Sequence, residues 1–213
     1  MPAVFDPSCR RCERLAHFLD EVQDKHPSYY CKPVPPFGDP LARLLVVGLA
    51  PGMHGANATG RPFTGDHAGI LLYQTLHRFG FSTEAESVTA DDGLRLVDCR
   101  ITNAVKCLPP DNKPVGAEIN TCNDYLRSEL ETMTDGSVVL ALGGIAHRAV
   151  IKALKLRQAD YKFAHAARHD LPGLVLLDSY HCSRYNTNTR RLTPEMFANV
   201  FGTARELLDS AGR

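Results

Sequence analysis

The chain has 213 residues, of which 44% are hydrophobic and 23% are charged, a composition typical of a globular protein and not of a disordered one. Its 24 basic and 24 acidic residues cancel, so no overall positive charge indicates a nucleic-acid partner. The balance is uneven, because residues 143–213 hold 11 basic and 6 acidic side chains and can present a local positive face.

No stretch of the sequence is long and apolar enough to span a bilayer, and the N-terminus lacks the charged-then-apolar order of a signal peptide. Seven cysteines in a chain without an export signal argue against a disulfide framework. Metal ligation or catalysis is the better interpretation of these cysteines. We therefore expect a cytoplasmic protein with no membrane partner.

Four short runs, each almost continuously apolar, predict strands that are covered on both faces, as in a parallel sheet. They are residues 44–48, 94–105, 138–142 and 174–177. Helix-length segments alternate with them at residues 67–79, 114–133, 145–156 and 194–208, the last with Thr193 as its N-cap and Pro194 in its first turn. This order predicts one three-layer α/β domain over residues 1–213, with ligands beyond the carboxyl ends of the strands.

The segment after the first predicted strand, residues 48–66, contains five glycines in 19 residues. Such a loop lets backbone approach a ligand closely, although a glycine-rich loop is by itself more often a structural turn. No Gly-Lys-Ser/Thr follows, so it is not a triphosphate-binding P-loop. The loop contains one aromatic residue, Phe63, and ends in Asp66, which can act in a site or simply cap the next helix.

Polar side chains also follow two later strands. Asn103 offers one acceptor and two donors at a strand end, which suits the edge of a base, although a lone Asn is more often a satisfied buried amide. His181 is followed by three arginines, a tyrosine and several amides within residues 182–193, a mixture that fits contact with a nucleic-acid backbone. A lone His at a strand end is otherwise more often structural.

The cysteines form two pairs, Cys9 with Cys12 and Cys107 with Cys122. A C-x2-C pair can ligate one ion or cluster at adjacent vertices, and the second pair would complete a shell of four thiolates. Three cysteines are left over, and one of them, Cys99, falls within a predicted strand and is expected in the core.

Three stretches together resemble the uracil-DNA glycosylase superfamily: GLAPGMHGANATGRPFTGD at residues 48–66, TNAVKC at 102–107 and HCSRYNTNTRRLT at 181–193. They are most similar to family 5, the iron–sulfur UDGb type, with family 4 as the next relative. The resemblance extends from Cys9 to Thr193 in the family's order. It implies an α/β/α sandwich around a four-stranded parallel sheet, and a [4Fe–4S] cluster held by Cys9, Cys12, Cys107 and Cys122.

The resemblance also implies roles for individual residues. Phe63 would stack on the extruded base, Asn103 would face its pyrimidine edge, and His181 would contact O2 of the leaving base. Asp66 would act on the water or the sugar cation. The substrate-binding residues would be Gly48, Leu49, Ala50, Pro51, Gly52, Phe63, Ser183, Arg184 and Asn186.

The sequence departs from the family patterns at two places. Leu49 stands where family 4 has an acidic residue, as expected of family 5, which leaves Asp66 as the best carboxylate. Arg184, Tyr185 and Arg190 are atypical in the loop that wedges the duplex, and they bear on DNA affinity and opposite-base preference.

The expected function is therefore a DNA repair glycosylase that hydrolyses the N-glycosidic bond of uracil, and of other deaminated or damaged bases, in double-stranded DNA with the base flipped out. We expect a nucleoid-associated monomer. No Lys occurs in residues 48–66 or 181–193, so the enzyme should be monofunctional and leave an abasic site; Pro2, exposed by loss of Met1, is the rival amine. The alternative is a non-catalytic iron–sulfur protein that binds nucleic acid or senses redox state. A zinc-dependent hydrolase would need His or carboxylate ligands at close spacing, and the sequence has none.

Overall fold

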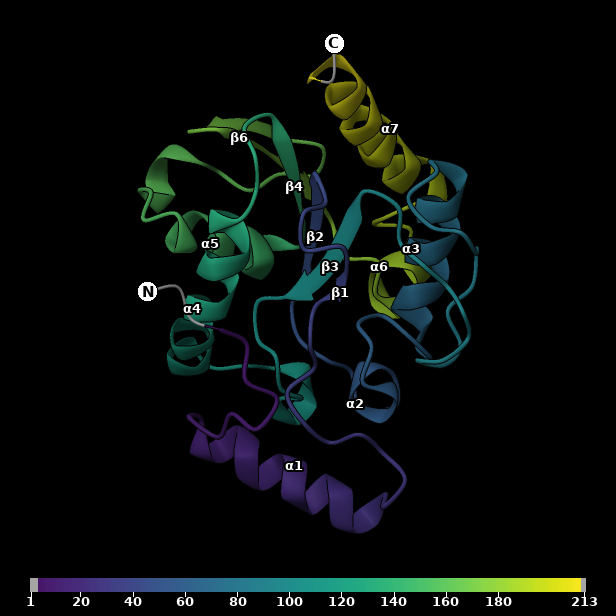
Figure 1. Cartoon of the computed structure of the whole chain (residues 1–213), viewed down its shortest axis with the longest axis vertical. Helices are drawn as coiled ribbons and strands as arrows, with labels where there is room; N and C mark the ends of the chain where they lie inside the picture. Colours follow the sequence, from purple (N-terminus) through teal and green to yellow (C-terminus); the bar gives the residue numbers. More distant parts are fainter. Residues whose placement is uncertain (1–3, 212–213) are drawn as a thin grey trace.

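The computed structural model describes residues 4–211, and its centre is a six-stranded sheet with the strand order β1-β3-β2-β4-β6-β5 (Figure 1). The strands are β1 (Phe37–Gly38), β2 (Leu44–Gly48), β3 (Cys99–Asn103), β4 (Ser137–Leu142), β5 (Arg168–Leu171) and β6 (Leu174–Ser179). The four inner strands are parallel, whereas β1 and β5 are antiparallel to their neighbours. The prediction of a parallel α/β sandwich is confirmed.

Seven α-helices are described in residues 4–211. They are α1 (Glu13–Lys25), α2 (Ala56–Thr59), α3 (His67–Arg78), α4 (Gly116–Glu131), α5 (Gly144–Ala153), α6 (Arg184–Asn188) and α7 (Pro194–Ala211). Helices α3 and α7 cover one face of the sheet, and α4 and α5 cover the other (Figure 1). None of these described helices combines the length and the apolar character needed to cross a bilayer.

The inner strand β2 is apolar throughout because both of its faces are buried. In β2, Leu44 and Val46 contribute to the core under α3 and α7, whereas Leu45 and Val47 contribute to the core under α4 and α5. Successive side chains of a strand point to opposite faces, so an unbroken apolar run supplies two cores at once.

The structure adds elements that the sequence pattern did not predict. The two edge strands are short, and β5 reads Arg-His-Asp-Leu, which carries no apolar run. The predicted strand at residues 94–105 is shortened to β3, because Asp98 takes a left-handed φ of 49° and pairs with the Arg43 side chain. Thr193 caps α7 as predicted, since its hydroxyl accepts the Met196 N–H at 3.2 Å.

Candidate active site

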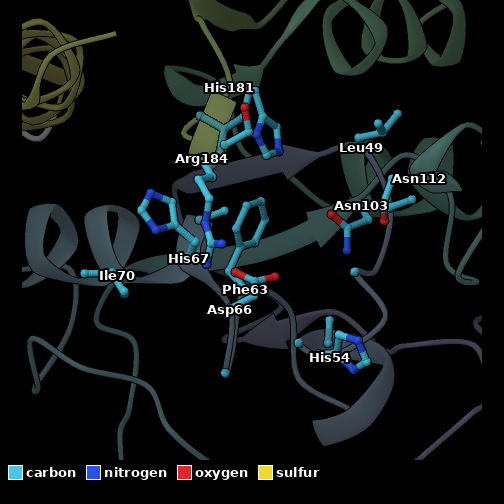
Figure 2. A pocket seen from close by; sticks show the side chains of 18 of the residues that line it. Leu49, His54, Phe63, Asp66, His67, Ile70, Asn103, Asn112, His181 and Arg184 are labelled. Atoms are coloured by element: carbon cyan, nitrogen blue, oxygen red, sulfur yellow. The ribbon is translucent and has the colours of Figure 1, made fainter. Parts of the chain in front are cut away.

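A cavity of about 1070 Å³ opens at the carboxyl ends of the parallel strands. Loops that follow all four inner strands contribute to its wall, which is the place that the topology of an open α/β sheet favours for a ligand. Figure 2 shows Phe63 near the centre of this wall, with His181 above it and Asp66 below it. Asn103 lies to its right, on the other side of Phe63 from His67. The structure therefore brings together the four side chains that the sequence singled out.

Asn103 is the last residue of β3 and is 3% exposed. Its amide oxygen is buried and has no hydrogen-bond partner among the described residues. Gly48, its neighbour across the parallel ladder, leaves the room that the amide needs: a Cβ at Gly48 would overlap Asn103 Oδ1 and lie 2.6 Å from Cζ of Phe63. An unpaired buried acceptor is costly, so this oxygen is poised for a donor on a ligand.

Phe63 takes a backbone φ of 54°, a left-handed conformation that is uncommon for a bulky side chain. The residue before it is fixed by Tyr73, whose hydroxyl donates to the Pro62 carbonyl at 2.9 Å. The Phe63 ring lies against the His181 ring, with 5.9 Å between centroids and 29° between planes. The strained turn thus presents an aromatic face in the wall of the cavity.

Asp66 is the N-cap of α3 and also lines the cavity. One carboxylate oxygen accepts the Gly69 N–H at 2.9 Å, and the other lies next to Gly55, where a Cβ would approach to 2.5 Å. Burial raises the pKa of Asp66, although backbone N–H groups of Gly69 and Ala68 partly oppose the rise. The two interpretations of Asp66 are compatible, because one oxygen caps the helix while the other stays available.

His181 follows β6 by two residues and is half-buried in the cavity wall. Burial lowers its pKa to about 4, so the imidazole is neutral at pH 7 and carries one N–H donor. The backbone at this position is held by Asn186, whose side-chain amide donates to the His181 carbonyl at 2.8 Å.

The predicted substrate-binding residues divide into two groups. Those that line the cavity are Leu49, Ala50, Gly52, Phe63, Ser183 and Arg184. The remaining three support the wall: Gly48 lies behind Phe63, Pro51 is buried, and Asn186 is engaged with His181. Ser183 also caps α6 by accepting the Asn186 N–H at 3.4 Å.

Sequence reasoning missed several residues of the wall. His67 lies at the start of α3, and its ring bonds the Thr187 hydroxyl at 3.0 Å, which joins α3 to α6. Gly143 and Gly144 follow β4 directly, so the strand-end rule could have identified them. Residues 86–88 come from a loop with no recognisable pattern, and no sequence signal points to them.

The four paired cysteines lie together on a different side of β3, beside α1. Cys9, Cys12, Cys107 and Cys122 surround one small cavity and pack with Leu15, Val105 and Tyr125. The other three cysteines do not line this cavity: Cys99 and Cys182 are buried in the main core, and Cys31 belongs to a cluster against which Cys107 packs and accepts a hydrogen bond from Asn57. The expectation that Cys99 is a core residue is confirmed.

The surroundings of the four cysteines match the chemistry of thiolate ligands. Burial raises the pKa of Cys107, and negative charge on the other three thiols raises it further, because the four sulfurs are close. Hydrogen bonds from Tyr125 and Arg11 outweigh burial at Cys9 and lower its pKa. The backbone N–H of Lys106 donates to Cys122 Sγ at 3.2 Å. Four close sulfurs whose negative charges would repel one another, with such donors beside them, fit a cation or cluster between them.

No lysine is among the side chains that line the large cavity within residues 4–211. Lys106 is buried elsewhere, paired with Glu129 at 2.6 Å. Pro2, the other candidate amine, lies outside the described residues.

The chain is similar to known proteins over most of its length. Residues 35–205 match the family model described as "Uracil DNA glycosylase superfamily". The chain is 46% identical to the Type-5 uracil-DNA glycosylase of Thermus thermophilus, covering 94% of both chains, and 43% identical to that of Pyrobaculum aerophilum, covering 92% of this chain and 88% of the relative. The crystal structure of wild-type Pedobacter heparinus SMUG2 superposes with a TM-score of 0.50 at 14% identity, covering 98% of this chain and 94% of that one, which supports the fold.

Proposed function

The chain belongs to the uracil-DNA glycosylase superfamily, and from that premise we propose that it hydrolyses the N-glycosidic bond between uracil and deoxyribose in DNA. The observation that carries this proposal is the unpaired Asn103 amide oxygen beside the Phe63 ring in the large cavity. The relatives are named as glycosylases, so a non-catalytic iron–sulfur protein is not the favoured alternative.

Recognition of the base follows from the side-chain amide of Asn103 and the aromatic ring of Phe63. Uracil presents an N3–H donor between two carbonyl acceptors, and a side-chain amide offers the complementary acceptor and donor. If the amide keeps the same orientation, cytosine sets its N3 acceptor against the Asn103 oxygen and leaves that oxygen unpaired in a buried place, which costs about 1–3 kcal/mol. The Phe63 ring supplies a stacking face that is indifferent to base identity.

Cleavage separates charge, because the sugar becomes cation-like while the base leaves as an anion. A neutral His181 can donate its N–H to O2 of the leaving uracil and stabilise the developing anion. The free oxygen of Asp66 can stabilise the sugar cation or orient the attacking water. Both groups are preorganised, Asp66 by its helix cap and His181 by the Asn186 bond to its carbonyl.

DNA is the partner that this chemistry requires, and the base must leave the stack to enter the cavity, at a cost of a few kcal/mol. Arg184 is exposed at the rim, next to Tyr185, which is 72% exposed. A guanidinium there can meet a phosphate, and the exposed ring can fill space in the duplex. We propose a monomer acting on double-stranded DNA in the cytoplasm.

A broader range of bases is part of the proposal. Leu49 and Ala50 line the cavity where a polar side chain would narrow it, and the cavity is large for a single pyrimidine. Hypoxanthine and etheno adducts are therefore expected to be released as well.

We also propose that Cys9, Cys12, Cys107 and Cys122 hold a [4Fe–4S] cluster. The cluster would tie α1 and the start of the chain to the segment after β3 and to α4, and its contribution there would be structural. The mutual repulsion of the four thiols and the donors at Cys9 and Cys122 support this ligand set.

The experiment that tests the function is base release under single-turnover conditions from a duplex with one labelled uracil. Wild type should release uracil and leave an alkali-labile site, with the matched cytosine duplex as the control. Asn103→Ala should lower the rate about 10²–10³-fold, whereas Asn112→Ala, at the rim of the same cavity, should change it little. Absence of release from any uracil substrate by folded, iron-replete protein would refute the proposal.

A further inference from the structure

A buried cluster of two histidines and one carboxylate lies outside the cavity, on the neighbouring edge of the sheet. His147 of α5 is 1% exposed and Asp178 of β6 is fully buried. His147 Nδ1 lies 2.8 Å from one oxygen of Asp178, and Nε2 of His169 on β5 lies 3.0 Å from the other oxygen. The second ring nitrogen of His147 lies 2.9 Å from the Tyr161 carbonyl.

Counting donors and acceptors fixes the charge of this ring. The Tyr161 carbonyl only accepts, so Nε2 of His147 must carry a hydrogen. The Asp178 carboxylate also only accepts, so Nδ1 must carry a second hydrogen. His169 reaches Asp178 through one ring nitrogen and can do so as a neutral imidazole. With Asp178 ionised, the contacts therefore require a doubly protonated His147.

This pair joins two segments that end at the cavity. Gly143, the N-cap of α5, donates its N–H to the Ser179 carbonyl at the end of β6 at 2.8 Å, and a Cβ at Gly143 would lie 3.6 Å from the Cβ of His181. The His147–Asp178 pair makes a second bond between the same two segments, one turn further into α5. The β4–β6 ladder, which ends at Leu142 and Ser179, and the His147–Asp178 pair thus act together to hold Gly143 and His181 in place.

We propose that His147 is a positioning residue of the active site, whose doubly protonated ring holds α5 against β6 and so fixes His181 at the cavity wall. This inference rests on the proposed glycosylase function for its consequence in catalysis. Its charge state rests on the contacts of the ring alone. The pair resembles the way in which a carboxylate orients a catalytic histidine, but here it acts one element away from the chemistry.

The groups around His147 set the direction of its titration. Burial opposes the charged ring, but the hydrogen bond and charge of Asp178, with the Tyr161 carbonyl, raise the pKa of His147 above its ordinary value. Arg148 on the same helix acts in the opposite direction, and the edge of the Phe163 ring faces the imidazole without charge. The stabilisation is therefore fully present below the pKa of an unfolded His, and it is lost as pH rises through the folded-state value.

The variant Asp178→Asn separates charge from shape. Its amide can donate to an unprotonated Nδ1 of His147 while its oxygen still accepts from His169, so both contacts survive with a neutral ring. The packing should be kept, but the need for the second proton disappears. Asp170→Asn on the exposed edge strand β5 is the matched control, since it removes one carboxylate from the same part of the sheet.

The test records side-chain 15N shifts of His147 and His181 and single-turnover rates on a uracil duplex over about pH 6 to 9. We expect both ring nitrogens of His147 to be protonated at pH 6 in wild type, with the His181 signal shifting as His147 loses its proton. The ratio of the wild-type rate to the Asp178→Asn rate should be near one at pH 6 and fall with rising pH, by up to about 10²-fold. The Asp170→Asn control should follow wild type.

Three outcomes would overturn the proposal: a His147 ring with one proton at pH 6, a rate ratio independent of pH, or one zinc ion bound per wild-type chain and lost in Asp178→Asn. If uracil is not released at any pH, the proposed function fails. The two 15N measurements still decide whether His147 is charged and whether His181 follows it.

Discussion

Replacing Asp66 with Asn would separate the helix cap that the structure shows for this residue from its proposed catalytic role. An Asn at the N-cap keeps an oxygen for the Gly69 N–H, and Asn is as good a helix cap as Asp. The change removes the negative charge and leaves the shape. We therefore expect the rate of uracil release to fall about 10²–10³-fold, the usual loss when one preorganised electrostatic group is removed.

Stability should change in the opposite direction. Because burial raises the pKa of Asp66 in the folded state, its ionised form is disfavoured there, and the contribution to stability is lost as pH rises through that raised value. Above it, Asp66→Asn should melt at a temperature equal to or higher than that of wild type. Asp66→Ala also loses the cap, worth about 1 kcal/mol, and should melt about 2–4 °C below Asp66→Asn.

The assay combines thermal unfolding with single-turnover rates across pH. In wild type the rate should rise with pH as Asp66 ionises and fall again where His147 loses its proton, whereas Asp66→Asn should lack the rise. Asp39→Asn is the matched control, since Asp39 also accepts a backbone N–H, from Leu41 at 2.8 Å, but lies on the exposed surface. Wild-type rates in Asp66→Asn would refute the catalytic role and leave only the cap.

Three further predictions follow from the same geometry. Cys107→Ser should bleach the brown colour near about 400 nm and lower the melting temperature, while Cys31→Ser should keep the colour; a full iron content in Cys107→Ser would contradict the ligand set. Gly48→Ala should displace the Phe63 ring or the Asn103 amide, cost about 1–3 kcal/mol of stability and slow uracil release; unchanged rates would show that the close packing is not required. Borohydride added during turnover should trap no protein–DNA adduct, because no lysine lines the cavity within residues 4–211; an adduct lost on changing Pro2 would establish a Schiff-base mechanism.

The parallel core of the fold could be predicted because burial on both faces leaves a simple trace in the sequence. The apolar runs of β2, β4 and β6 are unbroken, so their limits in the structure lie within two residues of the prediction. The edge strands β1 and β5 have one exposed side and no such trace. Helix α1 buries Leu15, Leu19 and Val22 at helical spacing, so this helix also leaves a periodic apolar pattern in the sequence.

The site could be predicted where motifs follow strands, and not where unrelated loops complete the wall. Asn103 and His181 are placed by strand ends, so their positions in the sequence and in the cavity coincide. Ser87 reaches the wall through Arg61, which is 4% exposed and bonds the Ser87 hydroxyl at 2.7 Å and the Asp92 carboxylate at 2.5 Å. That tie depends on long-range packing, which no local pattern records.

One physical cause, burial, shifts the pKa of both proposed catalytic groups. It keeps His181 neutral, and it raises the pKa of Asp66 while leaving one carboxylate oxygen free. A cationic His181 would bind the base strongly before the bond breaks as well as after. A neutral N–H donor binds more strongly chiefly as the base acquires negative charge in the transition state. Likewise, burial leaves the carboxylate of an ionised Asp66 poorly solvated, so this charge is better stabilised once the sugar becomes positive. The cavity is therefore a better match for the separated charges of the transition state than for the neutral nucleotide that enters it.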